Sequence, residues 1–338
     1  MSHRRRLAVV LAVLLAALAL ATWVLPHTAL LRRDPFALRD HAAEVVETHA
    51  EYIRAGATVI ETWNYSVTAH WLRAQPHLAT KTDEQVDAVL EDLLRRSVRL
   101  AKQAREQCNA PHVRIAGALP PLGATFDAED PVVIRTIAAR RIAQKLDVRA
   151  SYEQIARVLN EEGVDHFLIE TCAKISFAEA ALAACRATNP EREVWVSMTL
   201  QDQAPVVWSG ESVAEAVTAL TAGDVAPPSA ILFNCSPPEV ISQALKQLRP
   251  LFSGAIGGYA NRRGARVRYG ADTAQLQKEM GAEEAVLGER EDLEPEAYAG
   301  WATDWLTEGG ATILGGCCGV GPSHIQAVAQ AVRPTPAI

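Results

Sequence analysis

The chain has no excess of basic charge. Its 338 residues include 33 Lys and Arg against 40 Asp and Glu, for a formal net charge of -7. Residues 1–25 contain three arginines and no acid, so the remainder carries 30 basic and 40 acidic residues. Nucleic-acid-binding proteins use a basic face to hold phosphates, and this balance therefore argues against a nucleic-acid partner.

Cysteine is too sparse to form a disulfide framework. The chain has six cysteines and is neither short nor cysteine-dense, and a chain of this length can bury its core without such staples. Its composition is otherwise globular, with 49% hydrophobic and 22% charged residues. No short-period repeat and no low-complexity linker is present, so we expect residues 26–338 to form a single large domain after a separate segment, residues 1–25.

An uncharged run from Leu7 to Leu25 sets this first segment apart. The run follows Arg4–Arg6 directly and has 19 residues, which is long enough to span a bilayer as a helix. It also resembles a secretory signal, with Ala19-Leu20-Ala21 as a cleavage pattern; a buried core segment and a misassigned start are further interpretations. An exported protein that depends on free thiols would meet an oxidising compartment. We therefore expect a cytoplasmic protein, with membrane contact only through Leu7–Leu25.

Seven short apolar runs recur after Pro26 and alternate with stretches of helical spacing, such as residues 39–55 and 211–222. This alternation favours an α/β fold with a parallel sheet. Seven strands are one short of a (β/α)₈ TIM barrel, so we expect the first strand, before residue 40, to be abnormal or missing. An open doubly wound sheet is the runner-up, but no glycine fingerprint follows the first strand. The predicted strands are Ala57–Thr62, Val113–Leu119, His166–Glu170, Val194–Leu200, Ala230–Asn234, Ala255–Ala260 and Ala311–Leu314.

Polar, thiol and aromatic residues gather where these strands end, which is where barrels carry their catalytic groups. The strongest of these elements is the turn Gly315–Gly319, which contains Cys317 and Cys318. Neighbouring thiols on a strand point in opposite directions, but a glycine-rich turn can bring both toward one centre. With Cys235 at a nearby strand end, three thiolates and one open position would form the ligand set of a catalytic zinc. Buried small side chains and a vicinal disulfide are the alternatives.

Several segments resemble the homocysteine S-methyltransferase family over residues from about 40 to about 330. The pairing of NCS with GGCCG some eighty residues later is the most specific part of the resemblance. The segments that carry it are HAEYIRAGATVIETWNY, AGALPPL, SGES, LFNCSPPEVI, YANR and LEPEAYAGWATDWLTEGGATILGGCCGVGPSHI.

The resemblance implies zinc bound by Cys235, Cys317 and Cys318, and Glu170 in LIETC as the group that holds the homocysteine amino group. It also implies methyl transfer to the thiol of L-homocysteine, giving methionine. The family's donors are cations, and a sulfonium such as S-methylmethionine is expected here.

Four further strand-end residues are assigned to the substrate pocket. Trp63, Tyr65 and Tyr259 offer aromatic faces that attract a cationic donor, with packing at the rim as the alternative role of each. Asn234 is the fourth, and its alternative role, orientation of the zinc loop, is favoured over contact with the substrate.

Two departures from the family pattern concern the homocysteine pocket. The family opens with a strand that carries an Asp-Gly-Gly motif, and Leu7–Leu25 occupies its place here; Trp63 stands where the family usually has asparagine. The alternatives to the enzyme are therefore a degenerate barrel that binds zinc or a thiol without turnover, and a methyl-transfer module that depends on a corrinoid partner.

Overall fold

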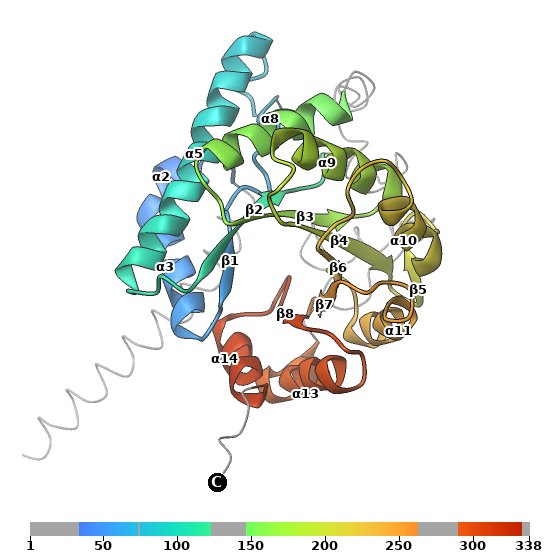
Figure 1. Ribbon diagram of the computed structural model, residues 1–338. Coiled ribbons are helices and arrows are strands. Elements are labelled where there is room, and N and C mark those ends of the chain that lie inside the picture. Colours follow the sequence, from blue (N-terminus) through green and yellow to red (C-terminus); the bar gives the residue numbers. More distant parts are fainter. Residues whose placement is uncertain (1–33, 74, 123–146, 263–289, 333–338) are drawn as a thin grey trace, which may run out of the picture.

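A curled parallel sheet forms the centre of the protein (Figure 1), which is seen here as a computed structural model describing residues 34–73, 75–122, 147–262 and 290–332. Neighbouring strands follow the order β1-β2-β3-β4-β6-β7-β8 and pair in parallel, and β5 is an antiparallel partner of β4. The strands are β1 (Val59–Glu61), β2 (Arg114–Leu119), β3 (His166–Cys172), β4 (Val194–Gln201), β5 (Ala204–Val207), β6 (Ala230–Asn234), β7 (Ala255–Tyr259) and β8 (Ile313–Leu314).

This architecture confirms the predicted α/β barrel class and all seven predicted strands. The short hairpin strand β5 was not predicted, and β3 continues two residues beyond its predicted end, to Cys172. Within the described ranges no strand joins β1 to β8, so the barrel is incomplete there. The run Leu7–Leu25 and most of the region expected to hold the first strand lie outside these ranges. No helix in the described part of the chain is long and apolar enough to span a membrane.

Helices cover the outer face of the curled sheet (Figure 1). The helices predicted over residues 39–55 and 211–222 are confirmed as α3 and α10. Helix α10 begins with a capping box in which Ser212 and Glu215 bond each other's backbone amides. The helices are α2 (Ala37–Asp40), α3 (Ala42–Arg54), α4 (Ala69–Arg73), α5 (Asp83–Gln107), α8 (Val148–Glu161), α9 (Ile175–Thr188), α10 (Val213–Thr221), α11 (Pro238–Leu248), η1 (Glu291–Leu293), α13 (Pro295–Thr307) and α14 (Pro322–Ala331).

The helical layer closes where the sheet does not. Helix α3 contacts α14, and the Tyr52 hydroxyl of α3 donates a 2.9 Å hydrogen bond to the backbone carbonyl of Val320, just before α14. Helices α3 and α14 are therefore joined directly, beside the gap between β1 and β8.

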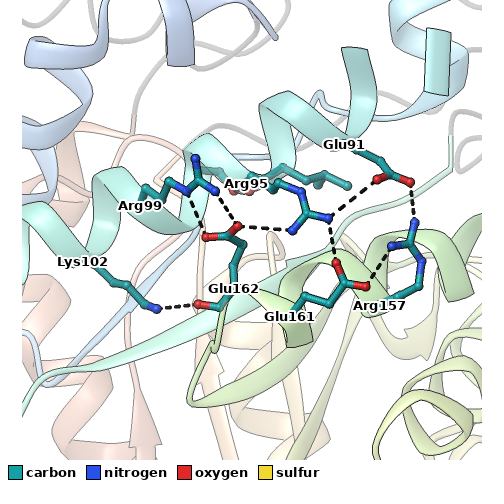
Figure 2. A network of polar contacts seen from close by, with 9 residues as sticks. Glu91, Arg95, Arg99, Lys102, Arg157, Glu161 and Glu162 are labelled. Atoms are coloured by element: carbon teal, nitrogen blue, oxygen red, sulfur yellow. Dashed lines mark hydrogen bonds and ion pairs between the residues drawn. The ribbon is translucent and has the colours of Figure 1, made fainter. Parts of the chain in front are cut away.

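An ion-pair network ties α8 to α5 on the outside of the barrel (Figure 2). Glu162, at the end of α8, accepts hydrogen bonds from Arg99 at 2.8 and 3.0 Å and from Arg95 at 3.3 Å. The hydrogen bond from Arg99 is the main cause of a lowered Glu162 pKa. Arg95 also bonds Glu161 at 2.6 Å. Single exposed ion pairs contribute little, but these linked pairs fix how α8 lies along α5.

Side chains alternate between the two faces of each strand, and this alternation defines the inside of the barrel. Leu168, Trp195 and Leu232 belong to a small apolar cluster inside the curl, separate from the larger core between sheet and helices. Counting two residues further along each strand places Glu170, Ser197 and Asn234 on this inner face. The inner face therefore changes from apolar to polar toward the carboxyl ends of the strands.

His166, the first residue of β3, should make the folded state sensitive to acid. It is fully buried against Trp195, with 4.1 Å between the ring centroids, and neither ring nitrogen has a hydrogen-bond partner among the described residues. Burial, aided by the charge of Arg114, lowers its pKa from 6.5 to about 4. The unfolded chain therefore takes up the proton first, so stability is lost as pH falls from about 6.5 toward 4.

We expect His166 to account for about 2–3 kcal/mol of the stability lost between pH 7 and pH 4.5. Urea unfolding at the two pH values measures this loss in the wild type, in His166→Leu and in His112→Leu, the control at an exposed histidine. The loss should be smaller only in His166→Leu. An equal loss in all three proteins would show that other groups cause the acid sensitivity.

Candidate metal centre

Three thiols converge at the carboxyl-terminal rim of the barrel. Cys235 directly follows β6, and Cys317 and Cys318 lie in the loop after β8. The Cys318 sulfur is 3.9 Å from the sulfur of Cys235 and 3.9 Å from that of Cys317, and all three sulfurs lie within 4.8 Å of one another. Tetrahedral zinc with Zn–S bonds of about 2.3 Å separates its thiolates by about 3.8 Å. The donor set and its spacing therefore fit zinc.

Crowding makes it unfavourable for the Cys317 thiol to ionise by itself. Hydrogen bonds with Cys235 and Cys318, followed by burial, raise the pKa of Cys317 well above its usual value. A bound dication reverses this balance, since coordination stabilises the thiolate. The cluster therefore suits a cation better than three free thiolates.

Glycines shape the turn that carries the two adjacent cysteines. A side-chain carbon on Gly316 would lie 2.0 Å from a methyl carbon of Val320, and Gly319 adopts a φ of +79° against Arg262. Glycine avoids the clash at position 316, and at position 319 it adopts the positive φ without strain. The turn is closed by a 3.1 Å hydrogen bond from the Val320 amide to the Cys317 carbonyl. The expectation that a glycine-rich turn brings both thiols to one centre is thus met.

Cys235 has a left-handed backbone, with a φ of +51°. This conformation is uncommon outside glycine and persists where neighbouring contacts enforce it. Those contacts include Ser236, fully buried, whose hydroxyl accepts a 2.8 Å hydrogen bond from the Leu200 amide of β4. Asn234, also fully buried, anchors the other side of Cys235.

The side chain of Asn234 joins three strands. Its oxygen accepts from the Thr171 amide at 3.1 Å and from the Ser197 hydroxyl at 2.9 Å, and its nitrogen donates to the Thr171 hydroxyl at 2.8 Å. Thr171 has a φ of +54° and lies where the register of β3 against β4 shifts. These bonds are those of a positioning residue, the alternative role given to Asn234 from sequence.

Glu170 lies within this irregularity, between Ile169 and Cys172, where a bulge can re-aim a side chain. The residue is 4% exposed, and its Oε1 atom has no hydrogen-bond partner in the described part of the chain. Burial raises the pKa of Glu170 well above its usual value, with contributions from Glu61 and Cys318. A buried carboxyl without a partner is costly. The Glu170 carboxyl is therefore suited to bind a hydrogen-bond donor of a substrate.

Of the three aromatic candidates, Tyr65 and Tyr259 lie near these groups. Desolvation raises the pKa of Tyr65 well above its usual value, with Glu170 and the three cysteines adding to the shift, although 41% of the residue is exposed. Tyr65 therefore lies at an open rim beside the thiols. Burial and then the charge of Glu170 raise the pKa of Tyr259. Trp63 makes an edge contact with His49 of α3, at 5.9 Å between ring centroids.

The sequence analysis missed four residues that support the site. The Tyr298 hydroxyl bonds the carbonyls of Ala260 and Gly315 at 3.2 and 2.8 Å. The other three, Ser197, Ser236 and Asn261, each bond a site residue or its neighbour. Ser236 and Asn261 stand in the NCS and YANR segments, which were singled out without a role for either residue.

The fold and the cluster together define an α/β barrel with a three-thiol group at its catalytic rim. The chain belongs to the homocysteine S-methyltransferase family, a family of methyltransferases, whose model matches residues 15–332. That match begins inside Leu7–Leu25, and the boundary at residue 25 remains a prediction.

Relatives include two proteins from Zea mays. Homocysteine S-methyltransferase 1 is 26% identical over 299 residues, covering 86% of this chain and 84% of the relative. Homocysteine S-methyltransferase 2 is 24% identical over 300 residues, covering 86% and 80%. The crystal structure of the metallated homocysteine methyltransferase MmuM from Escherichia coli has a TM-score of 0.62 at 22% identity, with 88% of each chain covered. At this identity the likeness supports the barrel fold.

Proposed function

We propose that the protein transfers a methyl group to the thiol of L-homocysteine, giving methionine, with zinc as its cofactor and a sulfonium such as S-methylmethionine as donor. The observation that carries the proposal is the convergence of Cys235, Cys317 and Cys318, with sulfurs within 4.8 Å of one another, in a chain of the homocysteine S-methyltransferase family.

The three cysteines would hold the metal and leave one position open for the substrate thiol. When bound, zinc supplies the positive charge that lets this thiol react as the thiolate at neutral pH. The cysteines themselves need not accept the thiol proton, which passes to solvent as homocysteine binds.

Glu170 would bind the ammonium group of homocysteine. Its unpartnered Oε1 and its burial support this role, because a charge-assisted hydrogen bond would satisfy the carboxylate. Trp63, Tyr65, Tyr259 and Asn234 are proposed to form or support the remaining pocket.

In the transfer, the homocysteine sulfur forms a bond to the methyl carbon while the bond from that carbon to the donor sulfonium breaks. The electron pair of the broken bond stays on the donor sulfur, which leaves as a neutral thioether. With S-methylmethionine both products are methionine. The donor's own charge is neutralised in this step, so alignment of the two substrates supplies much of the rate.

Methionine formation tests the proposal, with protein purified under reducing conditions and loaded with zinc. Homocysteine is supplied with S-methylmethionine, S-adenosylmethionine or betaine in separate reactions, and we expect S-methylmethionine to be used best. Transfer from betaine alone would overturn the sulfonium assignment. Zinc binding without methionine from any donor would favour the degenerate barrel, which the absence of an Asp-Gly-Gly motif from the sequence also favours.

A further inference from the structure

The four residues that end β7 and follow it, Tyr259–Arg262, lie between the two cysteine loops and bond to both. The Cys235 amide donates to the Tyr259 carbonyl at 3.2 Å. On the other side, the Cys317 amide donates to the Ala260 carbonyl at 2.9 Å, and the Arg262 amide donates to the Cys318 carbonyl at 2.8 Å. Each thiol-bearing residue is thus fixed by its main chain to this one segment.

Asn261, in this segment, also bonds a cysteine loop through its side chain. It is 4% exposed, and its Nδ2 atom donates to the carbonyl of Cys235 at 2.9 Å. Its own amide donates to the carbonyl of Ser236 at 3.2 Å. Most residue types could make the main-chain hydrogen bonds of this segment. The hydrogen bond from Nδ2, in contrast, requires an amide side chain at position 261.

The bond is made to a residue with an uncommon backbone conformation. Cys235 has a φ of +51°, and the orientation of its carbonyl is part of that conformation. A rotation of the backbone toward negative φ would redirect both the carbonyl and the side chain. The Cys235 sulfur would then leave its position 3.9 Å from the Cys318 sulfur.

We propose that Asn261 is a positioning residue of the metal centre, which holds Cys235 in its left-handed conformation so that the three sulfurs match one zinc ion. This inference rests on the proposed zinc centre and adds a residue to which no role had been given. Asn261 acts on the ligand's backbone and does not touch the metal or the substrate.

Asn64 offers a matched control. It is also a fully buried asparagine after a strand of the same sheet, and its Nδ2 atom donates to the backbone carbonyl of Ala118 at 2.9 Å. The carbonyl that it bonds belongs to β2 and not to a cysteine. Asn64→Asp therefore removes a comparable bond and adds a comparable charge, without touching Cys235.

The test measures zinc affinity by competition with a chelator in Asn261→Asp and Asn261→Ala, under reducing conditions. Outer partners of metal ligands typically contribute 10–100-fold to metal affinity, and we expect a loss in that range in both variants. Asn261→Asp keeps the size of the side chain and adds a negative charge that would attract zinc, so a loss there reflects the missing donor. Asn64→Asp should keep the wild-type affinity.

Cobalt substitution supplies a second readout. The thiolate-to-cobalt charge-transfer band depends on how many sulfurs bind, so it should weaken in both Asn261 variants and remain unchanged in Asn64→Asp. Wild-type affinity and spectrum in Asn261→Asp would overturn the role of Asn261 alone. An equal loss in Asn64→Asp would show a general effect of destabilisation and overturn it as well. A wild-type protein that binds no zinc would overturn the metal centre itself.

Discussion

Replacing Cys317 with serine is expected to remove zinc and methyltransferase activity together and to leave the barrel folded. A hydroxyl is a much poorer zinc ligand than a thiolate, and the proposed site would lose one of the three ligands assigned to it. The fall in zinc affinity should exceed the roughly 10–100-fold effect typical of outer partners. Cys235→Ser should behave in the same way, because its sulfur lies 3.9 Å from that of Cys318.

The fold should survive because the turn does not depend on the Cys317 sulfur. Its backbone is held by hydrogen bonds from the Cys317 amide to Ala260 and from the Val320 amide to Cys317. The neighbouring sulfurs also raise the pKa of the Cys317 thiol, so this thiol is uncharged in the metal-free protein. Its replacement by serine therefore removes no stabilising charge. We expect the free energy of unfolding of metal-free protein to change by less than about 1 kcal/mol.

Zinc per chain, measured alongside urea unfolding, checks this prediction. Cys108→Ser is the matched control, since Cys108 ends α5 and is a free, half-buried thiol outside the cluster. It should retain zinc and activity. Full zinc occupancy in Cys317→Ser or in Cys235→Ser would refute the ligand assignment.

Replacing Glu170 with glutamine or alanine should weaken homocysteine binding and spare zinc. Hydrogen bonds to charged groups contribute about 1.5–3 kcal/mol, so we expect KM for homocysteine to rise about 10–100-fold. Zinc content should remain at the wild-type level, because the carboxylate belongs to β3 and not to the three-thiol cluster.

The same substitution should leave the substrate-free protein at least as stable as the wild type. Glu170 is 4% exposed, with an Oε1 atom that lacks a partner among the described residues, and removing such a group relieves a desolvation cost. Steady-state kinetics and urea unfolding test the two effects separately. Glu296→Gln, at an exposed position of α13, is the control. Loss of zinc from Glu170→Gln would instead make Glu170 a support of the metal site.

The strands and the thiol cluster were predictable because both depend on local sequence. Each β-strand of the parallel sheet has its own apolar run, and a barrel brings the carboxyl ends of its strands to one rim. The glycines around Cys317 and Cys318 indicate a tight turn. These local sequence patterns are enough to predict that the three sulfurs lie on the same rim.

The supporting contacts were not predictable because they depend on pairing between distant segments. Asn234 bonds Thr171, 63 residues away, and the irregularity that includes Glu170 appears only when β3 is aligned with β4. The hairpin strand β5 is stabilised by pairing with β4 and not by a strong apolar run. The contact of Trp63 with His49 likewise follows from how α3 lies against the loop after β1.

The hydrogen bond between Tyr52 and Val320 bears on when the parts of the barrel can assemble during synthesis. It joins residues 268 positions apart, and Val320 closes the turn that carries Cys317. During synthesis, α3 leaves the ribosome long before that turn is made. Cys235 is likewise made before the last strand and the two cysteines that follow it. The proposed metal site is therefore complete only late in synthesis, unlike the site of a zinc finger, whose folding depends on its metal. Zinc bound as proposed would enter an almost complete barrel, and we expect zinc-depleted protein to be folded and inactive.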